Sequence, residues 1–166
     1  FLVNESVQPD RWLAIEGSPR STANFEWIRH VLGARDLTPK KAITEAIRTS
    51  HSGLLFSPRV PTGRGEFIGL GSHHTRGDLI RAVMEGIVFA HREHVEALVP
   101  KPKNRGVLTL TGGASRDARW CQLFADGLGC AIRVPKVDQL GARGAALCAG
   151  VGRGFWKEVT DAQSSF

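Results

Sequence analysis

The stretch Val107-Leu108-Thr109-Leu110-Thr111-Gly112-Gly113-Ala114-Ser115 decides the fold class of this chain. A buried, apolar strand is predicted over 106–111, and it ends in two glycines before a helix predicted over 115–127 with Ser115 as its cap. A strand followed by glycines and a helix places bare backbone N–H groups at a helix N-terminus, where no Cβ atom blocks a phosphate or a nucleotide. An ordinary tight turn between strand and helix would use the same glycines, so this stretch alone leaves both interpretations open.

Short apolar runs alternate with helical patterns along the rest of the chain, which is typical of an α/β fold. The pair Thr38-Pro39 predicts a helix start, because threonine caps a helix and proline suits its first position. The sequence shows no internal repeat and no interdomain linker, so we expect one domain or a piece of one. The predicted strands cover 12–16, 53–56, 66–70 and 131–134, and the predicted helices cover 22–32, 38–49, 75–98 and 141–151.

The composition is that of a folded protein. The 166 residues are 42% hydrophobic, enough for a sizeable core, which argues against disorder. The net charge of +6 raises the question of a nucleic-acid partner, but the basic residues are scattered and tyrosine is absent, so we expect none. No apolar run reaches the ~20 residues of a membrane span, and the start lacks the pattern of a signal peptide. We therefore expect a cytoplasmic protein without membrane contact.

The cysteines and histidines do not form a recognisable disulfide or metal pattern. Cys121, Cys130 and Cys148 show no CxxC spacing, and we expect them to be buried, unreactive thiols. His91 and His94 lie three positions apart on a predicted helix, but no third ligand is evident, so we expect surface histidines. No metal ligand is predicted in this chain.

Several charged or polar side chains stand out from their surroundings. Asp78 lies at a helix start, where a carboxylate complements the helix dipole, and Glu85 lies on an otherwise buried helix, so we expect its carboxylate to have a structural partner. Arg143 interrupts a run of small residues, 141–146, and needs an acidic or phosphate partner, or solvent. Close helix–sheet packing is our preferred explanation of the small residues. The sequence assigns no role to Arg143 or to the pair His73-His74.

Three segments together resemble the FGGY carbohydrate kinases. The segments 65–70 and 78–86, with seven residues between them, meet the positions of that family's C-terminal signature. The segment 111–115 is similar to the family's adenosine-binding segment, and 141–146 resembles its closing helix. The resemblance covers nearly the whole chain and leans toward the L-xylulose, xylulose and erythritol kinases. The signature residues are Gly65-Glu66-Phe67-Ile68-Gly69-Leu70 and Asp78-Leu79-Ile80-Arg81-Ala82-Val83-Met84-Glu85-Gly86.

The resemblance implies an α/β domain of the actin-like ATPase (ribonuclease H-like) type, with a mixed β-sheet flanked by helices. It implies an enzyme that transfers the γ-phosphoryl group of MgATP to a hydroxyl of a sugar or polyol, either a pentulose such as xylulose or a small polyol. Residues 1–166 would be the C-terminal, nucleotide-binding domain, without the N-terminal domain that holds the sugar and the catalytic aspartate. The chain alone would then be inactive and contain no catalytic residue.

The resemblance also implies which residues bind ATP. The two glycines of the turn would lie against the phosphate–ribose end of the nucleotide, the polar residues that follow them near the ribose or adenine, and the turn at the start of 22–32 against adenosine or phosphate. The implied ATP-binding residues are Gly112, Gly113, Ala114, Ser115, Asp117, Thr22 and Ala23. Many relatives have glycine at or near Thr22, where this sequence departs from them.

The cofactors implied by the family are ATP and Mg²⁺, and the partners are ATP, ADP and the acceptor. The resemblance leaves a homodimer open. The alternative function is an actin-like nucleotide-binding or interaction module without a sugar acceptor.

Overall fold

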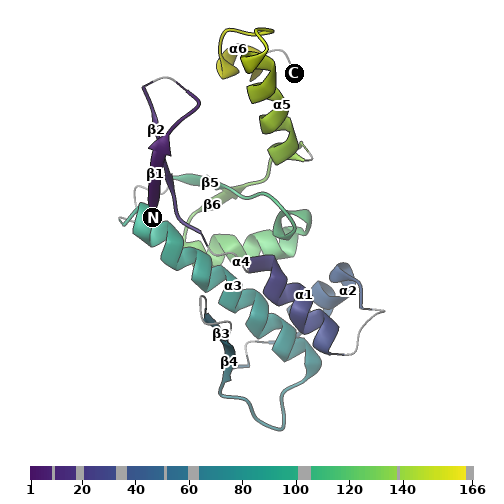
Figure 1. Ribbon diagram of the computed structural model, residues 1–166. Helices are drawn as coiled ribbons and strands as arrows, with labels where there is room; N and C mark the ends of the chain where they lie inside the picture. The colour runs from purple at the N-terminus through teal and green to yellow at the C-terminus, as the bar shows by residue number, and fades with distance from the viewer. Residues whose placement is uncertain are drawn as a thin grey trace. The chain divides into compact units, whose positions relative to one another are not determined.

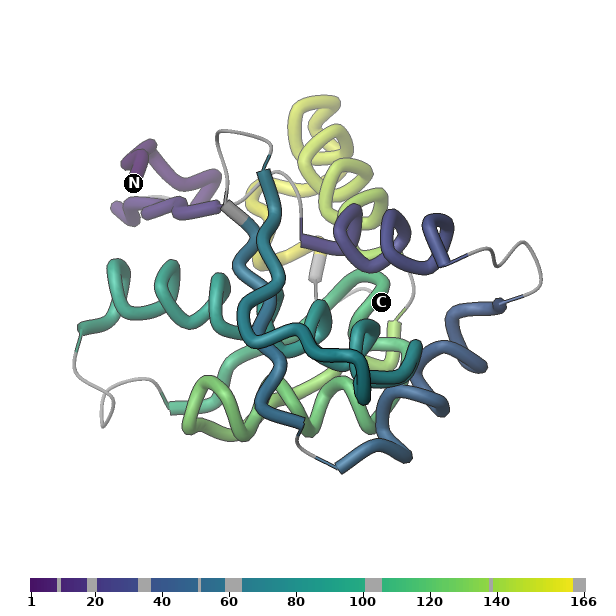
Figure 2. The backbone as a smooth tube through the Cα atoms, turned by 90° about the horizontal axis from the view of Figure 1, so that it is seen from below, coloured from purple at the N-terminus to yellow at the C-terminus, as the bar shows by residue number. Residues whose placement is uncertain are grey.

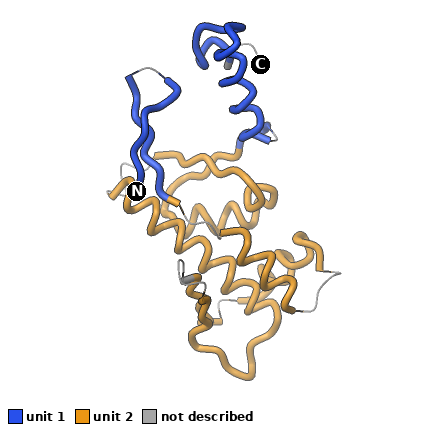
Figure 3. Tube along the Cα trace, viewed as in Figure 1, with its two compact units in different colours: residues 1–16, 135–166 blue, residues 17–134 orange. Residues whose placement is uncertain are grey.

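The chain divides into two compact units (Figure 3). The larger is Gly17–Val134, and the smaller combines Phe1–Glu16 with Pro135–Phe166. The prediction that residues 1–166 form one nucleotide-binding domain of a longer protein stays a prediction. This computed structural model describes residues 1–8, 10–17, 21–32, 37–50, 52–59, 64–100, 106–137 and 139–163.

Helix α3 (Arg76–Leu98) is the centre of the larger unit (Figures 1 and 2). The sequence predicts a helix over 75–98, which the structure confirms, and the side chains of Ile80, Val83 and Met84 on this helix are fully buried. The elements packed against it are α1 (Ser21–Val31), α2 (Pro39–Arg48), α4 (Ala118–Leu128) and strand β3 (Leu55–Arg59). The hydrophobic core of the unit lies where these elements meet α3.

Helices α2 and α3 begin where local capping signals place them. Thr38 caps α2, with its hydroxyl oxygen accepting the Lys41 N–H at 3.3 Å. Thr75 caps α3 in a capping box with Asp78, whose carboxylate accepts the Thr75 N–H at 2.8 Å and the Thr75 hydroxyl at 2.6 Å. These hydrogen bonds, first of all that of the Thr75 hydroxyl, hold the pKa of Asp78 below its ordinary value. The expected role of Asp78 at a helix start is confirmed.

The hairpin of β3 and β4 (Arg64–Ile68) packs closely on α3. The strands are antiparallel, with Phe56 opposite Phe67, so the two predicted strands are confirmed with shifted ends. A Cβ atom on Gly86 of α3 would lie 2.3 Å from the carbonyl oxygen of Phe56, so only glycine lets helix and strand approach this closely. The neighbouring Glu85 pairs with Arg81 at 2.8 Å, which confirms the expected structural partner.

Strand β5 (Val107–Thr109) is shorter and more exposed than the sequence predicts. It pairs in parallel with β6 (Ala131–Arg133), and within the described residues this sheet has two strands. The prediction of a buried strand over 106–111 is wrong, because Val107 is 54% exposed. With one partner strand and alternating side chains, only the middle pair, Leu108 and Ile132, packs on the core.

The smaller unit contains a hairpin and two helices. Strand β1 (Leu2–Glu5), which the sequence analysis did not predict, pairs antiparallel with β2 (Trp12–Ile15). Helix α5 (Leu140–Gly152) confirms the prediction over 141–151, and α6 (Val159–Gln163) follows it. Close packing in α5 occurs at Gly150, where a Cβ atom would lie 2.2 Å from the ring of Trp156, whereas Gly144 has open space beside it.

Among the described residues, no helix is both long enough and apolar enough to cross a membrane.

The three cysteine thiols differ in exposure. Cys121 and Cys130 are half-buried, whereas Cys148 is exposed, so the prediction of a buried thiol is wrong for Cys148. It lies on a face of α5 that the described residues leave open.

Candidate functional site

A pocket of about 530 Å³ opens within the larger unit, in the volume range of small-molecule sites. One wall is the first turn of α1, a second is the start of α2, and a third is the segment between β5 and α4. The residues that line it are Thr22, Phe25, Glu26, Thr38, Pro39, Lys40, Ile43, Gly113, Arg116, Asp117 and Trp120.

The structure brings three of the predicted ATP-binding residues together at this pocket. Thr22, Gly113 and Asp117 line it, and a Cβ atom on Gly113 would lie 3.5 Å from Cγ2 of Thr22. The first turn of α1 and the segment before α4 therefore approach each other at Gly113, which has no side chain.

The other predicted ATP-binding residues lie outside the lining of this pocket. Gly112 and Ala23 are exposed, and Ala114 is only 5% exposed and belongs to the hydrophobic core. Ser115 lines a separate, shallower pocket beside Cys121. Whether these residues contact ATP stays a prediction.

The glycine turn differs from the predicted strand-to-helix connection. Gly112 has φ of +87°, and a 3₁₀ turn over Ala114–Arg116 follows before α4 begins at Ala118. The prediction that Ser115 caps a helix over 115–127 is wrong, because its hydroxyl donates to the carbonyl of Gly112 at 2.8 Å inside the turn. Asp117 is the cap: its backbone is extended, and its carboxylate accepts the Arg119 N–H at 2.9 Å. At least one backbone N–H group at the start of this helix, which we expected to be free for a ligand, therefore donates to the side chain of Asp117.

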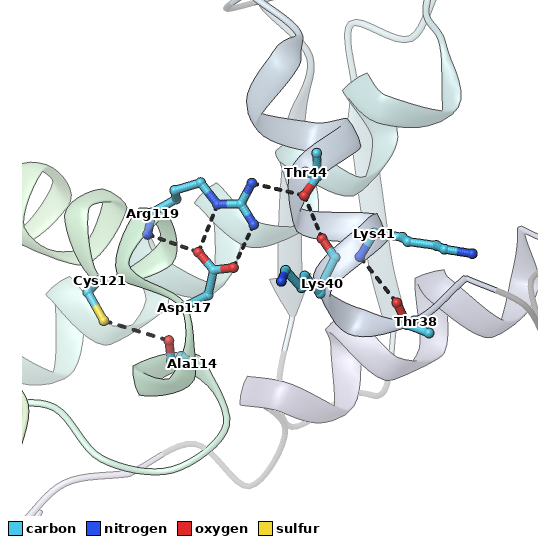
Figure 4. A network of polar contacts seen from close by, with 8 residues as sticks. All are labelled: Thr38, Lys40, Lys41, Thr44, Ala114, Asp117, Arg119 and Cys121. Carbon is cyan, nitrogen blue, oxygen red and sulfur yellow. Dashed lines mark hydrogen bonds and ion pairs between the residues drawn. The ribbon is translucent and has the colours of Figure 1, made fainter. Parts of the chain in front are cut away.

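Asp117 is held by an arginine that also reaches α2 (Figure 4). The guanidinium of Arg119 donates to both carboxylate oxygens of Asp117, at 2.9 and 2.7 Å, and to Oγ1 of Thr44 at 2.9 Å. The hydrogen bond from Arg119 keeps the pKa of Asp117 below its ordinary value. The same carboxylate and burial raise the pKa of the Cys121 thiol, burial having the larger effect.

The charges around the pocket leave it positive. Glu26 is paired with Arg29, and Asp117 is paired with Arg119, so both carboxylates of the lining are neutralised. Lys40 and Arg116 line the same pocket, and neither makes an ion pair with any residue in the described ranges. A pocket with two unpaired cations attracts an anionic ligand.

The floor of the pocket is apolar and aromatic. Phe25, Ile43 and Trp120 are at most 4% exposed, and the rings of Phe25 and Trp120 lie 4.6 Å apart between centroids. Nε1 of Trp120 is buried and has no hydrogen-bond partner among the described residues. An apolar floor below a cationic rim suits a ligand with a flat base and an anionic tail.

The sequence analysis missed Lys40 and Arg116. The Thr38-Pro39 cap did signal where α2 begins, and Lys40 follows it directly. Nothing in the local sequence indicates that this helix start faces the turn at Gly113, because the two segments are far apart along the chain and meet only through the packing of α2 and α4.

The described residues contain no group of three or more histidine, cysteine, aspartate or glutamate side chains that could hold a metal ion. The rings of His91 and His94 lie 6.2 Å apart, and Nδ1 of His91 is 2.8 Å from the carbonyl oxygen of Ile87. His74 accepts the Gly71 N–H at 2.9 Å, and its ring lies 4.1 Å from that of His73 between centroids, tilted by 35°. Neither pair lines the pocket described above.

Comparison with known proteins identifies relatives along almost the whole chain. The L-xylulose/3-keto-L-gulonate kinase of Escherichia coli (strain K12) is 28% identical over 98% of this chain and 34% of its own length. A glycerol kinase of Gloeobacter violaceus is 34% identical over 89% of this chain and 32% of its own length. The chain therefore spans about a third of the length of these relatives.

Solved structures show the same fold. A ligand-bound xylulose kinase from Lactobacillus acidophilus matches with a TM-score of 0.70 and 27% identity, over 84% of this chain and 30% of that one. A Plasmodium falciparum glycerol kinase solved with ADP matches with a TM-score of 0.67 over 87% of this chain and 30% of that one; at 23% identity it supports the fold alone. These matches confirm the predicted actin-like ATPase fold.

The pattern of the family described as "FGGY family of carbohydrate kinases, C-terminal domain" matches residues 11–153. Kinases of L-xylulose and xylulose are among the relatives, which agrees with the branch that the motifs favour. The chain belongs to the FGGY family of carbohydrate kinases and corresponds to the C-terminal domain of that family.

Proposed function

We propose that this chain is the ATP-binding half of an enzyme that phosphorylates a hydroxyl of a sugar or small polyol. The observation that carries the proposal is the pocket between Thr22, Gly113 and Lys40, in a domain of a carbohydrate kinase family. Relatives named as kinases of L-xylulose, xylulose and glycerol support a pentulose or a small polyol as the acceptor. As metabolic kinases, they also support a cytoplasmic location.

The pocket has the features that a nucleotide needs. Its volume of about 530 Å³ accommodates a purine nucleoside, and the aromatic floor offers stacking and dispersion contacts to a base. The absent side chain of Gly113 leaves room beside Thr22 for the ribose–phosphate part, and Lys40 and Arg116 supply positive charge.

Mg²⁺ would enter the pocket bound to the phosphates of ATP rather than being held there by the protein beforehand. Mg²⁺ in phosphoryl-transfer sites is typically held by substrate phosphates, waters and one or two carboxylates, and it neutralises the charge that develops on the phosphates. The described residues show no carboxylate cluster, and the acids at the pocket are engaged by arginines. We therefore assign no metal ligand and no general base among the residues that the structure describes.

The rest of the reaction would come from another part of a longer protein. Phosphoryl transfer needs a clamped triphosphate, an aligned acceptor hydroxyl and a closed site that excludes water. The chain covers about a third of its relatives, and we propose that the remaining length supplies the sugar site and the aspartate base. The isolated chain should then bind nucleotide without phosphorylating a sugar.

Calorimetric titration with MgADP tests the proposal, comparing the wild-type protein with Gly113→Asp. Gly113 has φ of −61°, which any residue adopts, and its Cβ would make ordinary contact with Thr22, so we expect the variant to fold. Its carboxylate would occupy the presumed phosphate path, and we expect MgADP binding to weaken by at least about tenfold, the cost of one unfavourable charge contact.

The matched control is Ala118→Asp. This residue is exposed, begins α4, where a carboxylate is favourable, and lies outside the lining of the pocket. It changes the net charge equally and should leave binding within about threefold of wild type, because Ala118 does not line the pocket and solvent screens the charge of an exposed side chain. A folded wild-type protein that does not bind MgADP would contradict the proposal.

A further inference from the structure

Arg119 lies outside the lining of the pocket, yet it connects two of the pocket's walls (Figure 4). One of these walls contains Asp117, and the other is the start of α2 with Lys40. The guanidinium donates to both oxygens of Asp117, at 2.9 and 2.7 Å, and its remaining terminal nitrogen donates to Oγ1 of Thr44 at 2.9 Å.

The hydrogen bonds continue from Thr44 to the pocket itself. The hydroxyl of Thr44 donates its proton to the backbone carbonyl of Lys40 at 2.8 Å, which leaves its lone pairs to accept from Arg119. Asp117, Arg119, Thr44 and Lys40 are therefore joined by a continuous series of hydrogen bonds, in which Arg119 donates to Asp117 and to Thr44, and Thr44 donates to Lys40. Both ends of this series are lining residues.

The planar guanidinium makes this connection specific. Two of its nitrogen atoms donate to the carboxylate in a forked geometry, and this fixes the direction in which the third nitrogen donates. A lysine could reach either Asp117 or Thr44, but one ammonium group cannot hold both in the same geometry.

We propose that Arg119 is a positioning residue, which fixes the spacing between the Asp117 wall and the Lys40 wall and so sets the affinity for nucleotide without contacting it. This inference rests on the proposed function, because it takes the pocket to be the nucleotide site. It extends the site by two residues, Arg119 and Thr44, that line no part of it.

A second arginine, which also binds a residue of α2, provides a matched comparison. Arg76 of α3 forms a forked pair with Glu45, the residue after Thr44, at 2.8 and 3.0 Å. It also ties α2 to a neighbouring helix, but neither partner lines the pocket. If α2 needed only general anchoring, loss of either arginine would have the same effect on nucleotide binding.

The test is calorimetric titration of the 166-residue chain with MgADP, together with thermal unfolding without nucleotide. We expect Arg119→Ala to raise the Kd about tenfold, since a charge-assisted hydrogen-bond network is lost at the wall. Arg119→Lys, which keeps the charge, should remain about fivefold weakened, because the fork is lost. Arg76→Ala should bind within about twofold of wild type, because neither Arg76 nor its partner Glu45 lines the pocket.

Thr44→Val isolates the link between the walls, because it keeps the Arg119–Asp117 pair and the size of the side chain. Its Kd should rise about threefold, because the hydrogen bond between Arg119 and Thr44 is lost while the Arg119–Asp117 pair remains. Adding Thr44→Val to Arg119→Ala should cause no further loss, since both remove the same connection. If Arg119→Ala does not fold, the Thr44→Val measurement decides the question alone.

Three results would overturn the inference. Wild-type affinity in Arg119→Ala or in Thr44→Val would show that the hydrogen bonds of Arg119 do not determine the affinity of the pocket for MgADP. An equal loss in Arg76→Ala would show that general anchoring of α2 is enough. Absence of MgADP binding by the folded wild-type protein would refute the proposed function and this inference with it, whereas wild-type binding with unaffected variants refutes the inference alone.

Discussion

Replacing Gly86 by alanine should destabilise the larger unit by closing the gap between α3 and β3. The Cβ atom would lie 2.3 Å from the carbonyl oxygen of Phe56 and 3.2 Å from its Cδ1 atom. The first distance is roughly 1 Å shorter than ordinary van der Waals contact allows. Because the obstructing atom belongs to the backbone of a paired strand, it cannot rotate away, so either the helix or the hairpin must shift.

The magnitude follows from two opposing effects. Overpacking of a well-packed core costs about 1–3 kcal/mol, and we take the upper end because the contact is with backbone. Alanine is preferred over glycine inside a helix by about 0.5–1 kcal/mol, which offsets part of this cost. The net expectation is a loss of about 2 kcal/mol, which lowers the Tm by about 4–8 °C for a protein of this size.

The same substitution in α5 gives the control. Gly144 is a helical glycine whose added Cβ atom would have nothing within 4 Å, so Gly144→Ala should gain about 0.5–1 kcal/mol from helix preference alone. Urea unfolding followed by circular dichroism measures both variants against wild type. A free energy of unfolding of Gly86→Ala within about 0.5 kcal/mol of the wild-type value would refute the close approach of α3 and β3.

Three further outcomes are expected. Gly112→Ala should lower the free energy of unfolding by about 1 kcal/mol, since φ of +87° is unfavourable for a residue with Cβ; an unchanged urea midpoint would contradict this turn. Lowering the pH from about 5 to about 3 should destabilise the protein. The pKa values of Asp78 and Asp117 are depressed by the capping threonine and by the adjacent guanidinium respectively, so their stabilisation is present above the ordinary pKa of aspartate and is lost as pH falls through the depressed values. A flat stability profile over this range would contradict both hydrogen-bond networks. Iodoacetamide should modify exposed Cys148 before Cys121, whose thiol pKa is raised by burial; mass spectrometry of a time course checks the order, and earlier modification of Cys121 would contradict it.

Elements with local signals could be predicted from the sequence. The helix over 75–98 has apolar residues at helical spacing, and the structure places α3 at Arg76–Leu98. The Thr38-Pro39 pair likewise gave the start of α2. These signals act within a few residues, so they do not depend on what the helix packs against.

Elements that depend on distant partners were predicted less well. Val107 looked buried because it belongs to an apolar run, but its exposure is decided by how many strands flank β5. The cap of α4 was assigned to Ser115, the first capping residue after the glycines, whereas Asp117 takes that role because the intervening residues form a 3₁₀ turn. Strand β1 is four residues long and fully exposed, which leaves no burial pattern to read.

The candidate site shows the same division. The glycine turn at Gly113 could be found because two adjacent glycines after a strand are a local signal. Lys40 and Arg116 could not, since their role follows from the opposition of two walls that only the fold brings together. The role proposed for Arg119 could not be predicted from the sequence either, because it depends on the hydrogen bond to Thr44 in another helix as well as the one to Asp117.

The use of carboxylates in the larger unit bears on what this domain can do. Asp78 and Asp117 begin helices, and Glu85 is paired with an arginine, so these acids are engaged in holding the fold. At the pocket, a glycine and two cations are left to meet a ligand. Such a site can bind a polyanion, but among the described residues it offers no free carboxylate to take a proton from an acceptor hydroxyl. We therefore expect a kinase built on this domain to take its base from another part of a longer protein, in line with the proposed function, and we expect the isolated chain to bind MgADP without phosphorylating a sugar.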